Sequence, residues 1–576
     1  MTGAEYIAQF LKQNGLNKVF LMTGGACAFI IDAIARTEGM DYFCFQHEQA
    51  AAMAADAIWR ISGKMGVSLA TSGPGATNLL TGIACSYFDS IPSFHITGQV
   101  NTLESAGFLH AKVRQAGFQE TDIVSMAKPI TKYAVRVTSA KELITELPKA
   151  FSIAIEGRPG PVLIDVPMNV QQEEIDHDII LPTISHIPTG VSPDYLSSKL
   201  ASFFKEAQRP VILFGAGLGL AGVGEDVAAW IEKSGIPFVS SWNGQTYFSH
   251  DLVTYCGNIG VYGNRGANYI LQNSDALLVL GSRLDNRQRS GNSQTFAPKA
   301  KVLVVDIDTE ELKKYHQNNY DTVSFNLKYI LPILHTIHPS PLSSKWSAFV
   351  NRIKKTYFRK NKSSFAEKNN SLSPYEVIER FQQIIADDAI VIGDTGACVC
   401  WLFQAFHRTN HTLFTAGGMS PMGYALPSAI GAALFQTTRR VISFNGDGGF
   451  QVNLQELQTV AYYHLDIKII IMNNYGYGII KQFQDSYCNS RYEATGNGYS
   501  APNFAKVAEA YGIPYRSIHT ITDINAEDFD FKGPMIIEVH LHPNTLIEPK
   551  LEMRKAIHEQ FPYLSSEETK GALEFL

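Results

Sequence analysis

A carboxylate set among glycines is the first feature of the sequence that could do chemistry. Asp447 lies in segment 445–450 (NGDGGF), which directly follows an apolar run at 441–444 and precedes an amphipathic stretch at 451–464. A glycine-rich turn between a strand and a helix exposes backbone N–H groups that can bind a phosphate. Such turns also occur where they only reverse the chain, so the motif alone does not assign a function.

A second polar residue follows the next apolar run. Asn474 comes 27 residues after Asp447, at the end of the run 467–472. One strand, one crossover helix and the neighbouring strand would bring both residues to the same edge of a parallel sheet. Asp447 then offers a carboxylate, Asn474 an amide oxygen and Gly476 a backbone carbonyl, which are ligands that Mg²⁺ takes beside phosphate oxygens. The spacing therefore predicts a Mg²⁺ and diphosphate site.

A glutamate near the N-terminus is the third candidate. Glu48 stands in segment 45–51 (FQHEQAA), just before a stretch of small residues that predicts a helix. A glutamate at a helix start usually only stabilises the helix dipole, so its position alone gives Glu48 no catalytic role. Its apolar surroundings would help to keep a carboxyl protonated at neutral pH.

These residues need a scaffold of buried strands with helices between them. Apolar runs of four to six residues alternate with amphipathic stretches, which is typical of strands buried on both faces of a parallel sheet. The alternation predicts an α/β fold of doubly wound parallel sheets with right-handed crossovers. One expected helix spans 451–464. The expected strands are 18–22, 66–70, 94–97, 162–166, 210–214, 276–280, 302–305, 389–392, 441–444, 467–472 and 535–539.

Length, composition and charge narrow the class of protein. The chain has 576 residues, 45% of them apolar and 18% charged, so a folded multidomain protein is expected rather than a disordered one. The net charge of −6 argues against nucleic acid as the main partner. Seven scattered cysteines favour a reducing compartment over a disulfide framework. The apolar runs are far shorter than the roughly 18 residues of a membrane helix, and the start lacks a secretory pattern, so a cytoplasmic protein without membrane contact is expected.

Two breaks in the pattern divide the chain. Segment 171–192 is acidic and carries two prolines, and segment 338–370 begins HPSPLSSK and continues into the basic run RIKKTYFRKNK. Because the basic run is short, it is predicted to be a solvated helix or linker rather than an anion-binding patch. The predicted domains are 1–170, 193–337 and 372–545, followed by a tail at 546–576.

The GDG segment followed by Asn473 and Asn474 resembles the cofactor motif of the thiamine diphosphate (ThDP) enzymes. The resemblance covers nearly the whole chain and is closest to the large, catalytic subunit of the acetolactate synthases. One glycine-rich string could reflect turn chemistry alone, but the shared order and spacing of many could not. The strings are GGA at 24–26, ATSGPGATN at 70–78, SIP at 90–92, TGQV at 97–100, FQE at 118–120, GRPGPVLID at 157–165, GSRLDNR at 281–287, DID at 306–308 and MGYALP at 422–427.

The resemblance implies a pyrimidine-binding domain, a central Rossmann-like domain and a diphosphate-binding domain. Glu48 would hydrogen-bond the aminopyrimidine ring of ThDP and so promote loss of the proton whose removal activates the cofactor. In this family the glutamate and the metal site that act on one ThDP come from different subunits. A homodimer or homotetramer is therefore expected, and a small regulatory subunit is a further expected partner.

The resemblance also gives roles to single residues. Gln119 would act with Glu48 at the catalytic centre, and Met422 would support the bent cofactor. Arg287 would bind the carboxylate of the second 2-oxo acid, for which a guanidinium is well shaped. Phe118 and Phe483 complete the expected substrate residues. The expected ThDP-binding residues are Gly25, Ala26, Glu48, Thr71, Gly396, Ala397, Met422, Gly446, Asp447, Gly448, Gly449, Asn474, Gly476, Tyr477 and Gly478.

The central domain resembles one that holds FAD in acetolactate synthases. Related enzymes keep this domain without flavin or use it for an ADP-containing ligand. The expected FAD contacts are Gly215, Gly217, Gly263, Arg283 and Asp306.

Some positions depart from the family's pattern. The family's Gln-His pair after a glycine is replaced by the segment 396–400 (GACVC), and its lysine after VP is Met168. A tryptophan that shapes the acceptor pocket in many members is Phe483, and an aspartate before the arginine is Asn286. Most of these changes fall near the acceptor pocket, so they leave the activation of ThDP intact and the acceptor open.

The expected reaction is decarboxylation of pyruvate and transfer of the two-carbon hydroxyethyl unit to a second carbonyl, with a 2-oxo acid as the first candidate. The same transfer to a nucleotide-linked keto-sugar stays open; Met168 and Phe483 favour it, and Arg287 argues for the 2-oxo acid. A flavin-linked pyruvate oxidase is a further alternative. A non-catalytic partner subunit is the last, and the intact set of Glu48 and Asp447 speaks against it.

Overall fold

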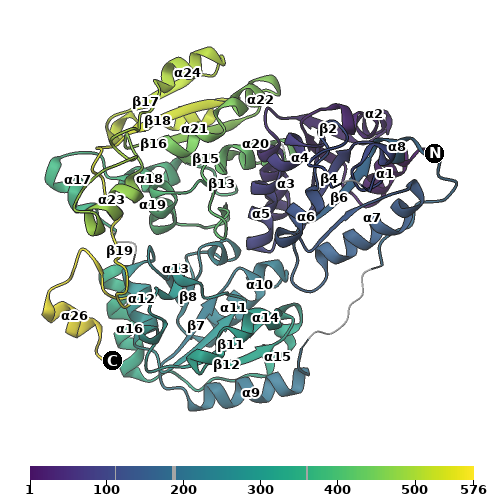
Figure 1. The fold of residues 1–576 in the computed structure, drawn as a ribbon. Helices are drawn as coiled ribbons and strands as arrows, with labels where there is room; N and C mark the ends of the chain where they lie inside the picture. The colour runs from purple at the N-terminus through teal and green to yellow at the C-terminus, as the bar shows by residue number, and fades with distance from the viewer. Residues whose placement is uncertain (111, 184–189, 359–360, 437) are drawn as a thin grey trace.

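The computed structural model describes residues 1–110, 112–183, 190–358, 361–436 and 438–576. These residues form three six-stranded parallel sheets with helices packed around them (Figure 1). The predicted α/β fold of three parallel sheets is therefore confirmed. Residues 184–189 and 359–360, which belong to the two predicted boundary segments, lie outside the described residues.

The N-terminal sheet has the strand order β2-β1-β3-β4-β6-β5. Its strands are β1 (Lys18–Leu21), β2 (Asp41–Cys44), β3 (Gly66–Ala70), β4 (Ser93–Gln99), β5 (Tyr133–Arg136) and β6 (Val162–Pro167). Its helices are α1 (Gly3–Gln13), α2 (Ala28–Arg36), α3 (Glu48–Ser62), α4 (Pro74–Asn78), α5 (Leu80–Asp89), α6 (Ile123–Ala127), α7 (Ala140–Ile155) and α8 (Met168–Gln172).

The central sheet has the order β12-β11-β10-β7-β8-β9. Its strands are β7 (Pro210–Phe214), β8 (Phe238–Ser240), β9 (Tyr255–Asn258), β10 (Ala276–Leu280), β11 (Lys301–Asp306) and β12 (Asp321–Ser324). Its helices are α9 (Pro193–Glu206), α10 (Gly217–Leu220), α11 (Gly224–Ser234), α12 (Arg265–Gln272), α13 (Asn286–Arg289), α14 (Thr309–Lys313), α15 (Ile330–Thr336) and α16 (Ser344–Tyr357).

The C-terminal sheet has the order β14-β13-β15-β16-β18-β17. Its strands are β13 (Ile390–Gly393), β14 (Thr412–Phe414), β15 (Val441–Gly446), β16 (Ile467–Asn473), β17 (Tyr515–Ile518) and β18 (Met535–His540). Its helices are α17 (Ser364–Asn369), α18 (Pro374–Ile384), α19 (Ala397–Ala405), α20 (Ala425–Phe435), α21 (Asp447–Val452), α22 (Leu457–Tyr462), α23 (Gly478–Tyr487), α24 (Phe504–Ala510) and α25 (Ala526–Asp530).

The strand orders place a crevice in each sheet. In the first and third sheets the chain reverses its direction of winding between the first and third strands, β1 and β3 or β13 and β15. In the central sheet it reverses between β7 and β10, which is the order of dinucleotide-binding domains. Ligands of open α/β sheets bind at the carboxyl ends of the strands that flank this reversal. The loops that follow these strands are therefore the places to look for a site.

Both faces of the inner strands are buried, as their continuous apolar runs predict. In β16, Ile469 and Ile471 pack into the core shared with the N-terminal domain, whereas Ile470 and Met472 pack into the core on the other face. Neighbouring residues of a strand point to opposite faces, so each run supplies two cores. The central strands are therefore fixed between two helical layers.

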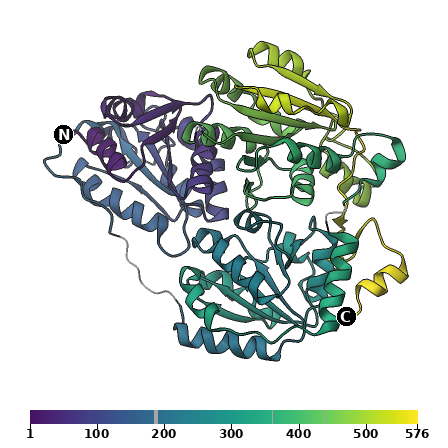
Figure 2. The same cartoon turned by 180° about the vertical axis from the view of Figure 1, so that it is seen from behind.

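The N-terminal and C-terminal domains meet through two helices of small residues. Helix α3 packs along α20, where the core contains Ala50, Ala54, Ala57 and Ala429. A Cβ at Gly431 would lie 2.6 Å from a backbone oxygen of α3, so only glycine allows this approach. Figure 2 shows these two domains beside each other and the central domain below them. The small side chains bring the helix backbones close together.

A buried ionic network joins all three domains. Arg60 of α3 binds Asp56 at 2.7 Å and Asp89 at 2.8 Å, and it donates to the Thr415 carbonyl of the C-terminal domain at 3.0 Å. Asn243 of the central domain donates to Asp89 at 3.4 Å. Three residues of this network also line the cavity described below, namely Arg60, Asp89 and Asn243.

The single helix predicted over 451–464 is wrong. Helix α21 ends at Val452, and α22 begins at Leu457 after one 3₁₀ turn. Asn453 interrupts the helix with φ −123° and ψ 31°, and its Nδ2 donates to the Gly423 carbonyl at 2.7 Å. The hydrogen bond from the Asn453 side chain to a distant carbonyl therefore holds Asn453 in a non-helical conformation, although the surrounding sequence has a helical pattern.

The tail returns to the central domain. The strands β19 (Lys550–Leu551) and β20 (Gln560–Phe561) form an antiparallel pair, and α26 (Ser566–Ala572) ends the chain. Phe575 packs edge-on against Trp346 and Phe349 of α16. Figure 1 accordingly places the C-terminus beside α16. No helix among the described residues is long and apolar enough to cross a membrane.

Candidate active site

The structure brings Asp447, Asn474 and Gly476 together at the carboxyl edge of the C-terminal sheet. Strands β15 and β16 pair with Gly446 opposite Met472, so the residues that follow each strand are neighbours. Asp447 is 1% exposed and Asn474 is 3% exposed. The end of the Asn474 carboxamide that faces them lies 3.1 Å from Asp447 Oδ1 and 2.9 Å from the Gly476 carbonyl.

These separations fit a cation. Adjacent oxygens around an octahedral Mg²⁺ with ligands at about 2.1 Å are about 3.0 Å apart. If Asn474 turns its Oδ1 toward Asp447 and Gly476, this oxygen lies at about that spacing from an oxygen of each. If Asn474 turns its amide nitrogen there, it donates to both. The donor set of one carboxylate, one amide and one carbonyl therefore fits Mg²⁺. No cluster of three or more histidine, cysteine or acidic side chains occurs elsewhere in the described residues.

Tyr499 holds the second oxygen of this carboxylate. Its hydroxyl donates to Asp447 Oδ2 at 2.5 Å, and its ring packs 4.5 Å from that of Tyr477. Burial raises the pKa of Asp447 to about 6, while the hydrogen bond from Tyr499 acts in the opposite direction. Tyr499 lies in a loop far along the chain, and the sequence pattern does not point to it.

The loop between Asn474 and Gly476 turns through a left-handed residue. Tyr475 has φ 54°, a conformation that costs a residue with a side chain of order 1 kcal/mol or more. Its N–H donates to Asn473 Oδ1 at 2.9 Å, and its hydroxyl bonds His540 Nδ1 at 2.6 Å. These contacts hold the turn that aims the Asn474 side chain and the Gly476 carbonyl at Asp447.

The glycines of the GDG segment are needed for close packing. A Cβ at Gly448 would lie 2.3 Å from the ring of Tyr477, and one at Gly449 would lie 2.6 Å from Asp394 Oδ2. Gly396 has φ 90° at the start of α19. The residues that begin α19 and α21 line a cavity, and backbone N–H groups at a helix start can bind a diphosphate.

Asp394 is a buried residue of the same edge that the sequence analysis missed. It follows β13 and accepts hydrogen bonds from the N–H groups of Thr395, Gly423 and Tyr424 at 2.7 to 3.3 Å. Burial raises its pKa to about 7. Asp394 thus ties the loop after β13 to the segment that carries Met422. Its place directly after an apolar run, next to a glycine turn, was a signal that could have found it.

A cavity of about 1120 Å³ extends from this edge to the central domain. It includes segments 395–401, 446–449 and 476–480 on one side and segments 281–283 and 285–288 on the other. The predicted residues that line it are Gly217, Arg283, Arg287, Asp306, Gly396, Ala397, Met422, Gly446, Asp447, Gly448, Gly449, Asn474, Gly476, Tyr477 and Gly478. The cavity therefore joins the predicted diphosphate site to the predicted flavin and acceptor residues.

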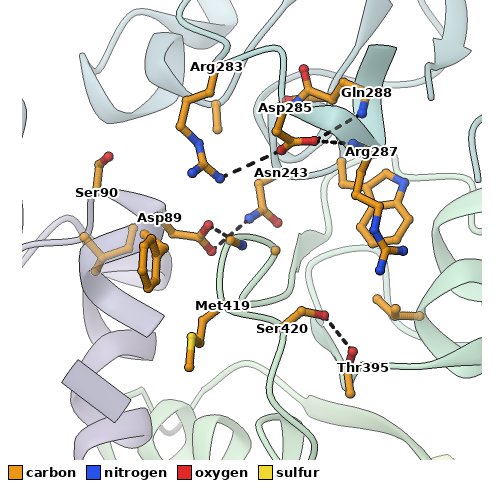
Figure 3. Close-up of a pocket in the computed structure, with 18 of the residues that line it drawn as sticks. Asp89, Ser90, Asn243, Arg283, Asp285, Arg287, Gln288, Thr395, Met419 and Ser420 are labelled. Carbon is orange, nitrogen blue, oxygen red and sulfur yellow. Dashed lines mark hydrogen bonds and ion pairs between the residues drawn. The ribbon is translucent and has the colours of Figure 1, made fainter. Parts of the chain in front are cut away.

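The central-domain side of the cavity carries several cations. The Arg283 guanidinium lies 4.0 Å from the Asp285 carboxylate. This carboxylate also accepts a hydrogen bond from the backbone N–H of Arg287 at 2.8 Å (Figure 3). The Arg287 guanidinium lies over the ring of Tyr262 at 5.3 Å. Figure 3 shows Arg283 and Arg287 pointing down from the central domain toward Met419, Ser420 and Thr395. These side chains are placed to meet an anionic ligand.

Two of the predicted FAD residues do not line the cavity. A Cβ at Gly215 would lie 2.1 Å from the Gly281 carbonyl, so this glycine lets the loops after β7 and β10 approach. The Gly263 carbonyl accepts from Gln560 Nε2 at 2.9 Å, which ties it to the tail. Both glycines thus contact other parts of the protein rather than the cavity.

A second cluster of predicted residues lies at the edge of the N-terminal sheet. Glu48 begins α3, is 6% exposed, and accepts from Asn78 Nδ2 at 3.0 Å. Thr71 accepts the Ala26 N–H at 3.2 Å, and a Cβ at Gly75 would lie 3.0 Å from Glu48 Oε1. Gly75 thus leaves this oxygen of Glu48 open. The loops after β1 and β3 gather around the glutamate.

The remaining predicted residues lie at the margins. Gln119 has φ 62° and packs against Gly73, beside the cluster around Glu48. Phe118 is 84% exposed, and Phe483 is 41% exposed and packs against Tyr487. None of Gly25, Ala26, Glu48, Thr71, Phe118, Gln119 and Phe483 is among the residues that line the cavity. Within one chain the glutamate cluster and the Asp447 cluster are therefore separate.

Comparison with known proteins agrees with this division. The chain matches the family models for the thiamine pyrophosphate enzyme N-terminal TPP binding domain at residues 1–126, the central domain at 197–327 and the C-terminal TPP binding domain at 394–539. Thiamine pyrophosphate is another name for ThDP. The fold and the two clusters thus define an enzyme that depends on ThDP.

Relatives along the full chain narrow the family. The acetolactate synthase large subunit of Lactococcus lactis is 34% identical, covering 96% of this chain and 94% of the relative. The acetolactate synthase isozyme 2 large subunit of Escherichia coli is 32% identical, covering 94% and 96%. A probable acetolactate synthase large subunit of Methanococcus aeolicus is 32% identical, covering 95% and 93%. The chain belongs to the thiamine pyrophosphate enzymes, in the family of the acetolactate synthase large subunits.

Proposed function

We propose that this chain is the catalytic subunit of a carboligase that decarboxylates pyruvate and transfers the two-carbon unit to a second carbonyl, with a 2-oxo acid as acceptor. One observation carries the proposal. A single cavity contains both the Asp447, Asn474 and Gly476 cluster and the Arg287 guanidinium. A cofactor site and an arginine suited to a carboxylate thus face one space. The names of the relatives support the same reaction.

Asp447, Asn474 and Gly476 would hold Mg²⁺, and the N–H groups at the starts of α19 and α21 would bind the diphosphate. Bound ThDP supplies the nucleophilic carbon and takes up the electrons that decarboxylation releases. Met422, which lines the same cavity, would contact the cofactor. Asp394 would keep that segment in place through its bonds to the N–H groups of Gly423 and Tyr424.

Glu48 would hydrogen-bond the pyrimidine ring through its buried carboxyl. Asn78 occupies Oε2, and Oε1 remains open beside Gly75. Because Glu48 does not line the cavity of its own chain, we propose that it completes the cavity of a partner chain, so that the enzyme acts as a dimer or a larger assembly. The large-subunit names of the relatives further suggest a small regulatory subunit.

The central domain would hold FAD at the reversal point between β7 and β10. Its strand order is that of dinucleotide-binding domains, and Gly217, Arg283 and Asp306 face the cavity there. Burial raises the pKa of Asp306, whose Oδ1 accepts the Asp308 N–H at 3.0 Å. Flavin absorbance of the purified protein, lost in an Arg283→Ala variant, would support this assignment.

The reaction is tested with ThDP, Mg²⁺ and pyruvate alone. We expect CO₂ and acetolactate to appear together, with two pyruvate molecules consumed for each acetolactate. CO₂ without acetolactate would contradict the 2-oxo-acid acceptor while keeping the donor half, and keto-sugars would then be tested. Absence of CO₂ with fully loaded protein would contradict the proposal as a whole.

Shared sites between chains are tested by mixing two inactive variants. A hybrid of a Glu48→Gln chain and an Asp447→Ala chain has one intact pair of clusters and one doubly defective pair. When the two chains pair at random, about half of the dimers are hybrids, and each hybrid has one intact site of two. The mixture should therefore show about a quarter of the wild-type activity per chain. Purified hybrids without activity would contradict a site shared between chains.

A further inference from the structure

A side chain of the C-terminal domain holds the turn that leads into Glu48. Strand β2 forms an edge of the N-terminal sheet, and the chain runs from it through residues 45–47 into α3, which begins at Glu48. An edge strand leaves alternate N–H groups without a strand partner. The Gln46 N–H is such a group, and it donates to the two carboxylate oxygens of Glu456 at 3.1 and 3.3 Å. The two domains are thus joined two residues before Glu48.

This contact is buried. Glu456 is fully buried, and its Oε2 also accepts the Thr459 hydroxyl at 2.7 Å. Burial raises the pKa of Glu456 to about 7, while the Thr459 hydroxyl and the N–H groups of Gln46 and His47 act in the opposite direction. Hydrogen bonds in such a low-dielectric setting are stronger than at the surface. The carboxylate therefore fixes the turn between β2 and α3.

The interruption of the helix after Asp447 places Glu456 at this turn. Asn453 leaves the helical conformation, the 3₁₀ turn Leu454–Glu456 follows, and Glu456 is its last residue. Glu456 follows Asp447 by nine residues, so a short segment connects the metal cluster to the turn before Glu48. Glu456 is not among the described residues that line the cavity. It can therefore act on a ligand only through another residue.

We propose that Glu456 is a positioning residue for Glu48, because it holds the backbone from which the Glu48 side chain projects. The inference rests on the proposed function, in which Glu48 bonds the pyrimidine ring of ThDP. Asn78 fixes Glu48 Oε2 at 3.0 Å, and Glu456 fixes the turn before it through Gln46. The two contacts together direct the open oxygen of Glu48. Since Glu48 acts in the cavity of a partner chain, Glu456 affects the partner's cavity rather than that of its own chain.

The first test compares Glu456→Met with the wild-type protein. Methionine keeps the length of the side chain and removes both acceptor oxygens. In the cofactor-free protein, we expect amide hydrogen exchange of segment 45–48 to become about tenfold faster, measured by mass spectrometry. In the protein loaded with ThDP and Mg²⁺, exchange of the thiazolium C2 proton for deuterium should become about tenfold slower, measured by NMR of the released cofactor. Glu456→Gln keeps one acceptor oxygen and should recover most of both losses.

Tyr463→Phe is the matched control. The Tyr463 hydroxyl accepts the Cys44 N–H at 2.9 Å on the same edge, so its loss should loosen the edge without slowing C2 exchange. Thr459→Val keeps the Glu456 carboxylate but frees it, and should slow C2 exchange less than Glu456→Met; it carries the test if methionine prevents folding. Wild-type C2 exchange in these two variants, or equal slowing in Tyr463→Phe, would overturn the inference. Wild-type C2 exchange in Glu48→Gln would contradict the role of Glu48 itself, and the inference with it.

Mixing of chains identifies the cluster through which Glu456 acts. Glu456→Met mixed with Asp447→Ala should show about a quarter of the wild-type activity, because one site of each hybrid has an intact Asp447 and a correctly held Glu48. Mixed with Glu48→Gln, it should show at most about a tenth, because every site then has a defective glutamate. The reverse pattern would mean that Glu456 acts on the Asp447 cluster and would overturn the inference. If the wild type released no CO₂ from pyruvate, the carboligase function would fail, but C2 exchange would still decide the role of Glu456.

Discussion

The hydroxyl of Tyr499 donates to Asp447 Oδ2 at 2.5 Å, while the other oxygen of that carboxylate faces Asn474. One oxygen is thus left for a metal and the other is fixed by a side chain 52 residues further along the chain. Groups that orient a metal ligand without touching the metal commonly change metal affinity by 10- to 100-fold. Tyr499 is therefore a positioning residue of the proposed Mg²⁺ site.

Removing this hydroxyl should weaken Mg²⁺ binding. We expect Tyr499→Phe to raise the Mg²⁺ concentration needed for half-saturation with ThDP by about tenfold, because Asp447 loses its fixed orientation. Intrinsic fluorescence during a Mg²⁺ titration measures the change. The exposed Tyr462 provides the matched control, and Tyr462→Phe should titrate like wild type. An unchanged midpoint in Tyr499→Phe would show that the hydrogen bond does not position the ligand.

Glu48→Gln should separate catalysis from folding. The amide keeps the size of the side chain and can still bond Asn78, so the unfolding temperature should be close to that of wild type. Turnover of pyruvate should fall by at least about 100-fold, as expected for loss of a group that moves or holds a proton. Steady-state CO₂ release and a thermal melt measure the two effects. Retained turnover would remove Glu48 from the proposed mechanism.

The ionic network of Arg60 should contribute strongly to stability. Arg60→Met leaves Asp56 and Asp89 buried without their cation, a change that typically costs about 3–5 kcal/mol. We expect the first unfolding transition in urea to shift to lower concentration. Arg36, exposed in its pairs with Asp32 and Glu5, provides the control, since such pairs contribute about 0–1 kcal/mol. Equal shifts for both variants would contradict the role of the network.

A buried histidine should make the N-terminal domain sensitive to acid. His95 bonds Ser68 at 2.7 Å and Ser93 at 2.8 Å, and burial lowers its pKa to about 3. In the unfolded chain the imidazole takes up a proton below a pH of about 6.5, whereas in the fold it stays neutral. The contribution of the neutral His95 to the free energy of unfolding is therefore complete above pH 6.5. It decreases by about 1.4 kcal/mol per pH unit as the pH falls toward 3.

Replacement of His95 should flatten this dependence. We expect the unfolding temperature of His95→Gln to fall less between pH 7 and pH 5 than that of wild type, because glutamine cannot take up a proton. Differential scanning calorimetry at both pH values gives the comparison. His335 is exposed, so His335→Gln should follow the wild-type slope. A wild-type slope in His95→Gln would mean that His95 does not set the acid response.

The inner strands other than β8 could be read from the sequence, but the edge strands could not. In β16 every residue is buried, so its apolar run is continuous. Most residues of the edge strands β2 and β17 are exposed or half-buried, and their polar residues hide the pattern. Strand β8 has only three residues, too few for a periodic signal. Exposure therefore explains why β2 and β17 were missed, and short length explains β8. Strand β9 is buried throughout, but its residues Tyr255–Asn258 do not form an apolar run.

The proximity of Asp447, Asn474 and Gly476 could be predicted because these residues follow adjacent strands at a fixed spacing. Asp447 and Asn474 are joined by one crossover, formed by α21, a 3₁₀ turn and α22, between the adjacent strands β15 and β16, so local topology determines their distance. Tyr499 reaches the same region from a loop. Its position depends on tertiary packing between distant segments, for which a single sequence carries no periodic signal. The same holds for the separation of Glu48 from Asp447.

The N-terminal and C-terminal sheets share one strand order, and the central sheet does not. Loops that occupy equivalent places in the two sheets can therefore be compared inside one molecule. Segment 24–26 after β1 corresponds to 394–397 after β13, and 71–75 after β3 corresponds to 447–449 after β15. All four turns are small-residue turns, yet one pair surrounds a carboxyl suited to a ring and the other a carboxylate suited to a metal. One strand order thus positions two different clusters in the same chain, and under the proposed function each cluster would act only when a partner chain brings the other to it.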